Sequence, residues 1–197
     1  MATKHTVIYV PGLGDTNISG RQKLLSIWHY KNIAIEACSM NWQVNEPLAD
    51  KLERLVSRID TLQSSGQKVS LIGESAGASA VINALKLRPK ALNAVILLCG
   101  KSQYPDRIGT HLRHKNPRLY ESVALSHEYI QAMPTEHKAK VLNLHPVADP
   151  VVPVRETKIN GVRNAKMPSF GHATSIIFGM TIWSFSIVHF IKGQGSK

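Results

Sequence analysis

Residues 73–77, Gly-Glu-Ser-Ala-Gly, constrain the fold of this chain more than any other stretch. They follow a short apolar run at 69–72 and open a segment with helical character at 76–87. A serine between two glycines at a strand-to-helix junction predicts a tight turn, because glycine lets a strand and a helix approach closely. Such a turn holds the serine in a sparsely populated backbone conformation and exposes its hydroxyl. The alternative is a turn of small residues that only packs a helix on a sheet.

The segments around this turn alternate between strand and helix patterns, which predicts an α/β fold with a mostly parallel sheet of about six strands flanked by helices. The expected strands are short β-branched or apolar runs, the last of them weak and at an edge: Thr6–Val10, Ile33–Cys38, Lys68–Ile72, Asn93–Cys99, Val141–His145 and Gly161–Met167. The expected helices are Ser19–Tyr30, Pro47–Ser64, Ala76–Leu87 and Ala173–Ile191. In Pro47–Ser64 the apolar residues share one helical face, and we expect charged residues such as Lys51 to lie off that face.

The last of these helices is apolar enough to allow two interpretations. A membrane-spanning helix needs ~20 predominantly apolar residues. Ala173–Ile191 is marginal in length and contains His189 and several serines and threonines. We therefore expect a helix packed against the sheet rather than one that lies in a membrane.

Residues 101–138 interrupt the alternation with a polar, locally basic segment. The segment is long for a connection in a compact domain, which indicates a functional cover or an excursion. Within it, Tyr120–Met133 is expected to form one or two short helices. Since 197 residues fit one domain, we predict a single domain, 1–197, with 101–138 as a short lid insertion.

Composition and cysteine usage bear on the compartment. Residues 1–10 lack a basic region followed by a long apolar run, so we expect no secretory signal. Two cysteines, Cys38 and Cys99, do not make a disulfide framework. Both observations predict a cytoplasmic protein.

The formal charge of +11 would suit anionic lipid, nucleic acid or an acidic substrate. No basic stripe carries interleaved aromatic residues, so we expect a basic, soluble surface and no nucleic-acid partner. Weak contact with a membrane surface stays open.

The loop at 11–16, Pro-Gly-Leu-Gly-Asp-Thr, follows the first expected strand. Its Gly-x-Gly is similar to a dinucleotide-binding loop, but position 17 is Asn17 where that pattern needs a third glycine, and no Gly-Lys-Ser/Thr follows for a mononucleotide. We expect instead that its backbone amides, in particular that of Leu13, face Ser75 and form an oxyanion hole with the amide of Ala76. A tight turn that only starts a helix is the alternative.

Asp149 and His172 are the expected partners of Ser75. All three residues follow predicted strands, and the carboxyl ends of parallel strands meet at one edge of a sheet. Their order along the chain, Ser, Asp, His, is the order expected with this type of turn. The alternatives are His145 as the base, although it precedes the acid on the same strand end, and Asp15 or Asp106 as the acid.

These pieces together resemble the α/β-hydrolase family, in particular a small serine esterase-like member, over nearly the whole chain. The matching residues are 73–77, Asp149 with the Val-Val-Pro that follows Pro150, and Gly171-His172 before the last helix. The chain departs from the family at Pro11-Gly12, where members often have His-Gly. We expect two further departures: the initial antiparallel strands of larger members are missing, and the short stretch between Asp149 and His172 reduces one helix to a turn. The family's usual cap position falls at 101–138, so the resemblance implies a short lid there.

The resemblance also implies a strand order in which two other strands lie between the strand of Cys38 and the strand of Cys99. The two cysteines would then be too far apart to form a disulfide. Cys99 would end its strand near the site, where it either touches substrate or packs as a small apolar residue.

The site residues predict a serine hydrolase that cleaves a small-molecule carboxylic ester or thioester through an acyl-enzyme. Ser75 would attack, His172 would act first as base and then as acid, and Asp149 would orient the imidazole. No cofactor is expected, and no histidine or cysteine spacing indicates a metal site. The alternatives are a peptidase, amidase or acyltransferase with the same residues, or a non-catalytic ligand- or membrane-binding protein on this fold.

Overall fold

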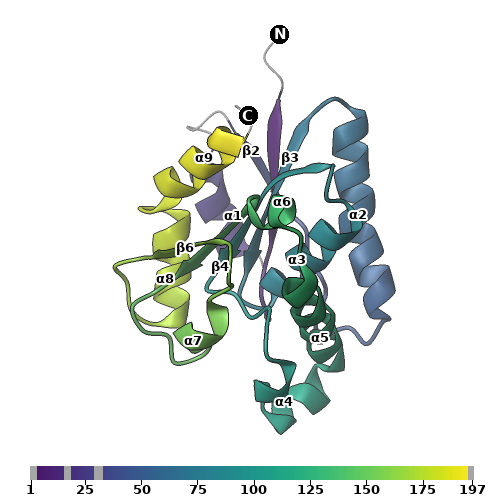
Figure 1. Cartoon of the computed structure of the whole chain (residues 1–197), viewed down its shortest axis with the longest axis vertical. Helices are drawn as coiled ribbons and strands as arrows, with labels where there is room; N and C mark the ends of the chain where they lie inside the picture. The colour runs from purple at the N-terminus through teal and green to yellow at the C-terminus, as the bar shows by residue number, and fades with distance from the viewer. Residues whose placement is uncertain (1–3, 16–18, 29–32, 195–197) are drawn as a thin grey trace.

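Six parallel strands form one sheet with helices on both faces (Figure 1). The arrangement comes from a computed structural model, in which residues 4–15, 19–28 and 33–194 are described. The strands are β1 (His5–Val10), β2 (Ala34–Ala37), β3 (Lys68–Glu74), β4 (Leu92–Leu98), β5 (Val141–His145) and β6 (Arg163–Lys166), in the spatial order β2-β1-β3-β4-β5-β6. Every pairing between these strands is parallel. The predicted fold class is confirmed, with the weak sixth strand at an edge.

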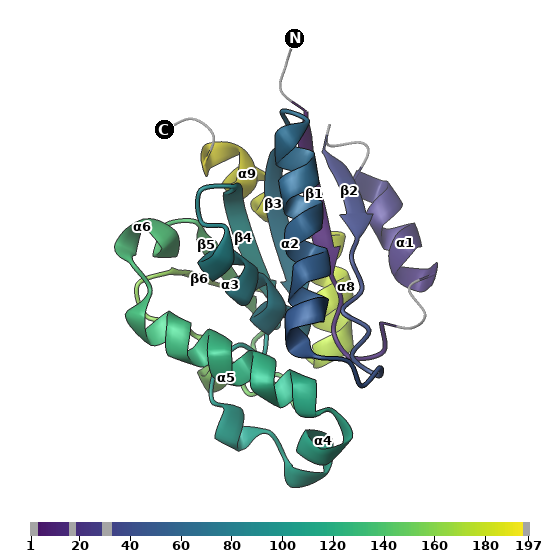
Figure 2. The ribbon, with the colours of Figure 1, turned by 90° about the vertical axis from the view of Figure 1, so that its right-hand side faces the viewer.

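The helices divide into two layers. On one face lie α2 (Leu48–Ser64), α3 (Gly77–Leu87) and α5 (Pro117–Ala132); on the other lie α1 (Ser19–Ser26), α8 (His172–Met180) and α9 (Ser184–Gly193), as Figures 1 and 2 show. The short elements are the 3-10 helix η2 (Pro105–Arg107) and the helices α4 (Thr110–Lys115), α6 (Thr135–Lys138) and α7 (Val154–Thr157). The single turn of α7 matches the reduced helix implied between Asp149 and His172.

Two hydrophobic cores result from the alternation of side chains along the strands. In β1, Ile8 and Val10 pack under α2 and α3, while Val7 and Tyr9 pack on the opposite side. All four are buried. Central strands that are apolar on both faces are typical of a parallel sheet covered by two helical layers.

Most predicted element boundaries differ from the observed ones by a few residues. The second strand is shorter than Ile33–Cys38, and the first helix ends at Ser26. The predicted end of that helix, Tyr30, lies outside the described residues, as does Thr16 of the loop at 11–16.

Residues 101–138 contain η2, α4, α5 and α6. Helix α5 is a single helix that buries Leu119, Val123 and Ile130 in the core beside α3. Helix α4 has no buried residue and lies beyond the carboxyl ends of the strands (Figure 2). The lid role assigned to the whole segment stays a prediction.

The prediction of one continuous helix over Ala173–Ile191 is wrong, because α8 and α9 meet at a bend of 57°. The backbone carbonyl of Met180 accepts a hydrogen bond from the indole N–H of Trp28 (3.0 Å), while the backbone N–H of Ser184 donates to Thr181 instead (3.3 Å). The i to i+4 ladder is therefore interrupted at this point.

Both helices of this bent pair bury one face against the sheet. No single helix in the described ranges is long and apolar enough to cross a membrane. Taken together, α8 and α9 have the length and the apolar composition of a membrane-spanning segment, but they are bent.

The prediction for Lys51 is also wrong. Its side chain is fully buried on the apolar face of α2. The ammonium donates to the backbone carbonyls of Met40 (3.1 Å), Asn41 (2.7 Å) and Val44 (2.9 Å). These acceptors compensate the lost hydration and tie the loop after β2 to the helix.

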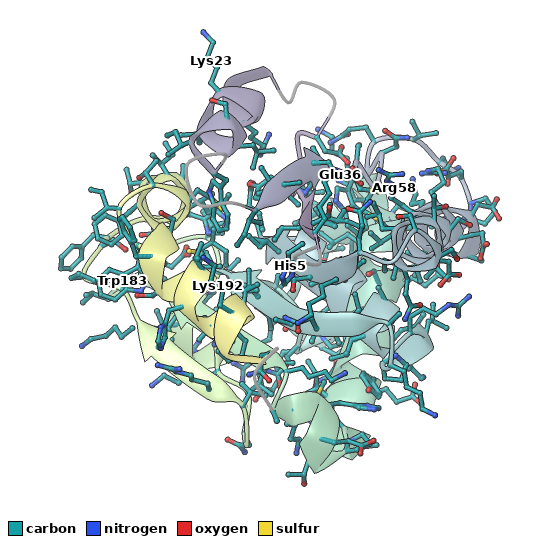
Figure 3. All side chains as sticks on the ribbon, turned by 90° about the horizontal axis from the view of Figure 1, so that it is seen from above. His5, Lys23, Glu36, Arg58, Trp183 and Lys192 are labelled. Carbon is teal, nitrogen blue, oxygen red and sulfur yellow. The ribbon has the colours of Figure 1, made fainter. Side chains whose placement is uncertain are left out.

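His5 at the start of β1 couples the fold to pH. Its ring Nε2 lies 2.9 Å from the Ser70 hydroxyl of β3. Burial, together with the positive charges of Lys68 and Lys192, lowers the pKa of His5 to about 4. Figure 3 shows His5 and Lys192 near each other on the face seen from above.

We predict that His5→Gln loses less thermal stability than the wild type on acidification. The unfolded chain protonates His5 near pH ~6.5, above the pKa in the folded protein, so its contribution to stability is lost as pH falls through this window. Melting curves by circular dichroism at about pH 7 and about pH 5 measure the difference. An equal fall in Tm for both proteins would contradict this role.

Candidate active site

The turn at 73–77 holds Ser75 at the carboxyl end of β3. The φ of Ser75 is 50°, in the left-handed region that non-glycine residues rarely occupy. Its backbone N–H donates to the carbonyl of Leu98 (3.0 Å), and its carbonyl accepts from the N–H of Lys101 (2.9 Å). The backbone on both sides of the serine is thus bonded to the end of β4, which maintains the unfavourable conformation.

Close contacts explain the glycines around Ser75. A Cβ atom at Gly73 would lie 2.6 Å from the carbonyl oxygen of Gly77, and one at Gly77 would lie 2.1 Å from that of Val10. A Cβ at Gly12 would lie 2.8 Å from the Cβ of Ser75. The predicted tight passage between strand and helix is present, and the loop after β1 lies directly against the serine.

An extension of the β5–β6 pairing brings Asp149 and His172 to the same edge. Beyond β5, the N–H of Val147 donates to Ser169 (2.9 Å) and the N–H of Gly171 donates to Ala148 (2.9 Å). The φ of Gly171 is 79°, which lets the chain turn into α8 at His172. The acid and the histidine therefore stand on two bonded loops, next to β4 and the serine.

Ser75, His172 and Asp149 form a continuous chain of hydrogen bonds. The Nε2 atom of His172 lies 2.9 Å from Ser75 Oγ, and its Nδ1 atom lies 2.7 Å from Asp149 Oδ2. The other oxygen, Asp149 Oδ1, accepts the N–H groups of Val151 (2.8 Å) and Val152 (2.9 Å). A carboxylate can only accept, so Nδ1 carries the proton and Nε2 is free to accept the serine hydroxyl.

The alternative base and acids lie in other environments. The Nδ1 atom of His145 lies 3.0 Å from the carbonyl oxygen of Pro146. Asp15 is buried and accepts from the Ser39 hydroxyl (2.7 Å), and Asp106 is exposed on η2. The geometry thus selects His172 and Asp149 as the partners of Ser75.

A cavity of about 260 Å³ opens beside the Ser75 hydroxyl. Leu13 and Ala76, the predicted oxyanion donors, both line it, although their donor roles stay predictions. Its walls are largely apolar, with residues from the end of η2, from α4 and α5 and from the segment after Asp149: Ile108, which follows η2, Leu112, Leu119, Val151, Val152 and Pro153. Three charged residues also line it: Lys101, Arg107 and Glu156.

Glu74 is a buried acid that sequence reasoning passed over. Both its carboxylate oxygens accept from Arg21 (2.8 and 3.0 Å), and the Tyr9 hydroxyl donates to it as well. Burial raises the pKa of Glu74 to about 7, and the backbone N–H of Gly12 opposes this rise by hydrogen bonding to the carboxylate. Glu74 thus ties the loop of Gly12 to the serine turn. An acid at the end of a mostly apolar strand, directly before Ser75, is the signal that could have indicated it.

The cysteines directly follow strands β2 and β4, and β1 and β3 lie between these strands as implied. Both thiols are free. Cys99 is completely buried, and burial raises the pKa of its thiol to about 12. It therefore packs as a small apolar residue. In the described part of the chain, no group of three or more His, Cys, Asp or Glu residues could hold a metal ion.

The parallel sheet, the serine turn and the order of the three residues define the α/β-hydrolase fold. No protein-family model and no curated protein matches the sequence. Solved structures match over almost the whole chain. Est1E from Butyrivibrio proteoclasticus is 16% identical, with a TM-score of 0.69 over 99% of this chain and 90% of its own.

Two further structures give the same result. The monoacylglycerol lipase of Paleococcus ferrophilus is 18% identical, with a TM-score of 0.65 over 98% of this chain and 96% of its own. An α/β-hydrolase enzyme from a lagoon-sediment metagenome of Mar Chica, Morocco, is 12% identical, with a TM-score of 0.70 over 98% and 92%. The chain has the α/β-hydrolase fold.

We predict that Gly77→Ala lowers the free energy of unfolding by about 2 kcal/mol or more, because the new methyl group collides with the backbone of Val10. The matched control is Gly20→Ala in α1, where nothing lies within 4 Å of the added atom. We expect this variant to be neutral or slightly stabilised. Urea unfolding of both variants measures the difference, and equal stabilities would refute the steric explanation.

Proposed function

We propose that this protein is a serine hydrolase that cleaves carboxylic esters or thioesters through an acyl-enzyme. The observation that carries the proposal is the hydrogen-bonded chain from Ser75 Oγ through His172 to Asp149. It is joined to a cavity whose apolar walls would exclude water from an acyl or alcohol group.

In the first half of the reaction, Ser75 Oγ attacks the carbonyl carbon while His172 Nε2 takes the hydroxyl proton. The resulting imidazolium is stabilised by Asp149, whose side chain is completely buried and accepts from Nδ1. Backbone N–H groups of Ala76 and Leu13 are the proposed donors to the oxyanion. The imidazolium then gives its proton to the leaving alcohol or thiol, and the acyl group stays on Ser75.

In the second half, a water molecule gives its proton to His172 and attacks the acyl-enzyme. Collapse of this second intermediate breaks the bond to Ser75 Oγ, which recovers the proton from His172 as the acid leaves. No proton carrier other than His172 is needed.

The names of structural neighbours support an ester as the bond that is cleaved. Est1E was also solved with ferulic acid bound, and the Paleococcus ferrophilus protein is a monoacylglycerol lipase. Amidases, peptidases and acyltransferases can use the same three residues. A cytoplasmic location and weak contact with a membrane surface also remain proposals.

We predict that Ser75→Ala and His172→Ala each lower the turnover of 4-nitrophenyl esters by ~10⁴- to ~10⁶-fold with the fold intact. The assay compares a series of acyl chain lengths, with the matched thioesters and anilides to separate the bond types. A fluorophosphonate probe should label the wild type at Ser75 and leave Ser75→Ala unlabelled. Turnover by Ser75→Ala at the wild-type rate would disprove the assignment.

We predict that Asp149→Asn lowers turnover by about 10⁴-fold, because the amide no longer selects the tautomer that leaves Nε2 free. Asp106→Asn is the matched control, since this carboxylate is exposed on η2. It should keep wild-type turnover. A comparable loss in both variants would show that Asp149 has no special role.

A further inference from the structure

Beside Ser75, the cavity contains a cluster of three charged side chains, Lys101, Arg107 and Glu156, that the proposed reaction does not use. They come from separate parts of the chain: the turn after β4, η2 and α7. We call these residues the charged cluster.

The charged cluster is centred on a buried ion pair. Lys101 Nζ lies 2.6 Å from Glu156 Oε2, and their side chains are only 11% and 6% exposed. A buried ion pair rarely stabilises a fold more than apolar residues of similar size would. Its presence in a cavity with otherwise apolar walls therefore points to binding rather than to stability.

Arg107 adds a second cation at the outer side of this pair. Its Nη1 atom lies 3.4 Å from Glu156 Oε1, and its guanidinium carbon lies 4.7 Å from the centre of the Tyr104 ring. The side chain is 48% exposed, so solvent and ligands can reach it. The aromatic ring and the carboxylate hold the guanidinium at the cavity before any ligand binds.

The charges of the cluster do not cancel. Two cations share one carboxylate, which leaves one positive charge in excess. An ammonium has three N–H donors and a guanidinium has five. Glu156 is the acceptor that both side chains contact among the described residues, so donors of both remain for a second anion. The turn that carries Lys101 is bonded to the backbone of Ser75, so this excess charge lies within reach of a bound substrate.

We propose that the charged cluster binds a carboxylate carried by the substrate, so that the preferred substrate is an ester or thioester with an anionic arm. The inference rests on the proposed hydrolase function, whose site it shares. A neutral acyl chain would satisfy the apolar walls but leave the donors of Lys101 and Arg107 without the partner that an anionic arm supplies.

The test compares kcat/KM for 4-nitrophenyl adipate monoester and 4-nitrophenyl hexanoate, which have equal acyl chain length and differ in the terminal carboxylate. Phenyl hexanoate and 4-carboxyphenyl hexanoate make the same comparison on the alcohol arm. Rates are corrected with Ser75→Ala. We expect the wild type to prefer the anionic member of one pair, which identifies the arm that enters the cavity.

Two variants change this preference in opposite directions. Arg107→Gln should lower the ratio of kcat/KM values about 5- to 20-fold, because it removes one charge at the cavity. Glu156→Gln keeps a side-chain oxygen for Lys101 but removes the competing carboxylate, so it should raise the ratio. Lys115→Gln is the control: it removes one exposed positive charge from α4, outside the lining of this cavity, and should keep the wild-type ratio.

A wild type that prefers the neutral ester in both pairs, or an equal ratio in Arg107→Gln and Lys115→Gln, would overturn the inference. Binding of monomethyl adipate and methyl hexanoate to Ser75→Ala, measured by calorimetry, provides a readout that does not need turnover. If no ester is hydrolysed but monomethyl adipate binds more tightly and Arg107→Gln weakens its binding, the hydrolase proposal fails and the anion site remains. If esters are hydrolysed without this preference, the anion site alone fails.

Discussion

The contact between the start of α3 and the end of β1 determines where the other parts of the site can lie. Gly77 approaches the carbonyl of Val10 more closely than any residue with a Cβ atom could. This approach places the loop of Gly12 against Ser75 and fixes the serine between the ends of β3 and β4. The left-handed conformation of Ser75 costs free energy, which the surrounding hydrogen bonds and packing offset.

The rest of the candidate site depends on register. The parallel pairing aligns the ends of β3, β4 and β5, and the bonds that continue beyond β5 carry Asp149 and His172 to the serine. A change of one residue in this extension would turn the imidazole away from Ser75. Strand β6 has no buried residue, so it contributes little to the core. Its pairing with β5 serves mainly to orient His172.

The sequence could predict the strands, because runs of apolar residues mark them locally. It could also predict that Ser75, Asp149 and His172 meet, because each follows a predicted strand. It could not predict Lys51, whose burial depends on three carbonyls of another loop. Nor could it predict the bend between α8 and α9, where Met180 accepts a hydrogen bond from the indole of Trp28, two residues after the end of α1. The roles of Glu74 and Glu156 are likewise set by distant partners. Such contacts have no periodic signature, so they became visible only in the structure.

The 97 positions that separate Ser75 from His172 have a consequence for folding. Contacts between segments so distant along the chain form late, because a long loop must close first. A partly folded chain with only β1, β3 and β4 assembled would hold the serine turn but would lack the imidazole that we propose activates Ser75. If Ser75 is the nucleophile, as proposed, the moment at which it becomes reactive toward a covalent probe during refolding would mark the docking of the C-terminal helices.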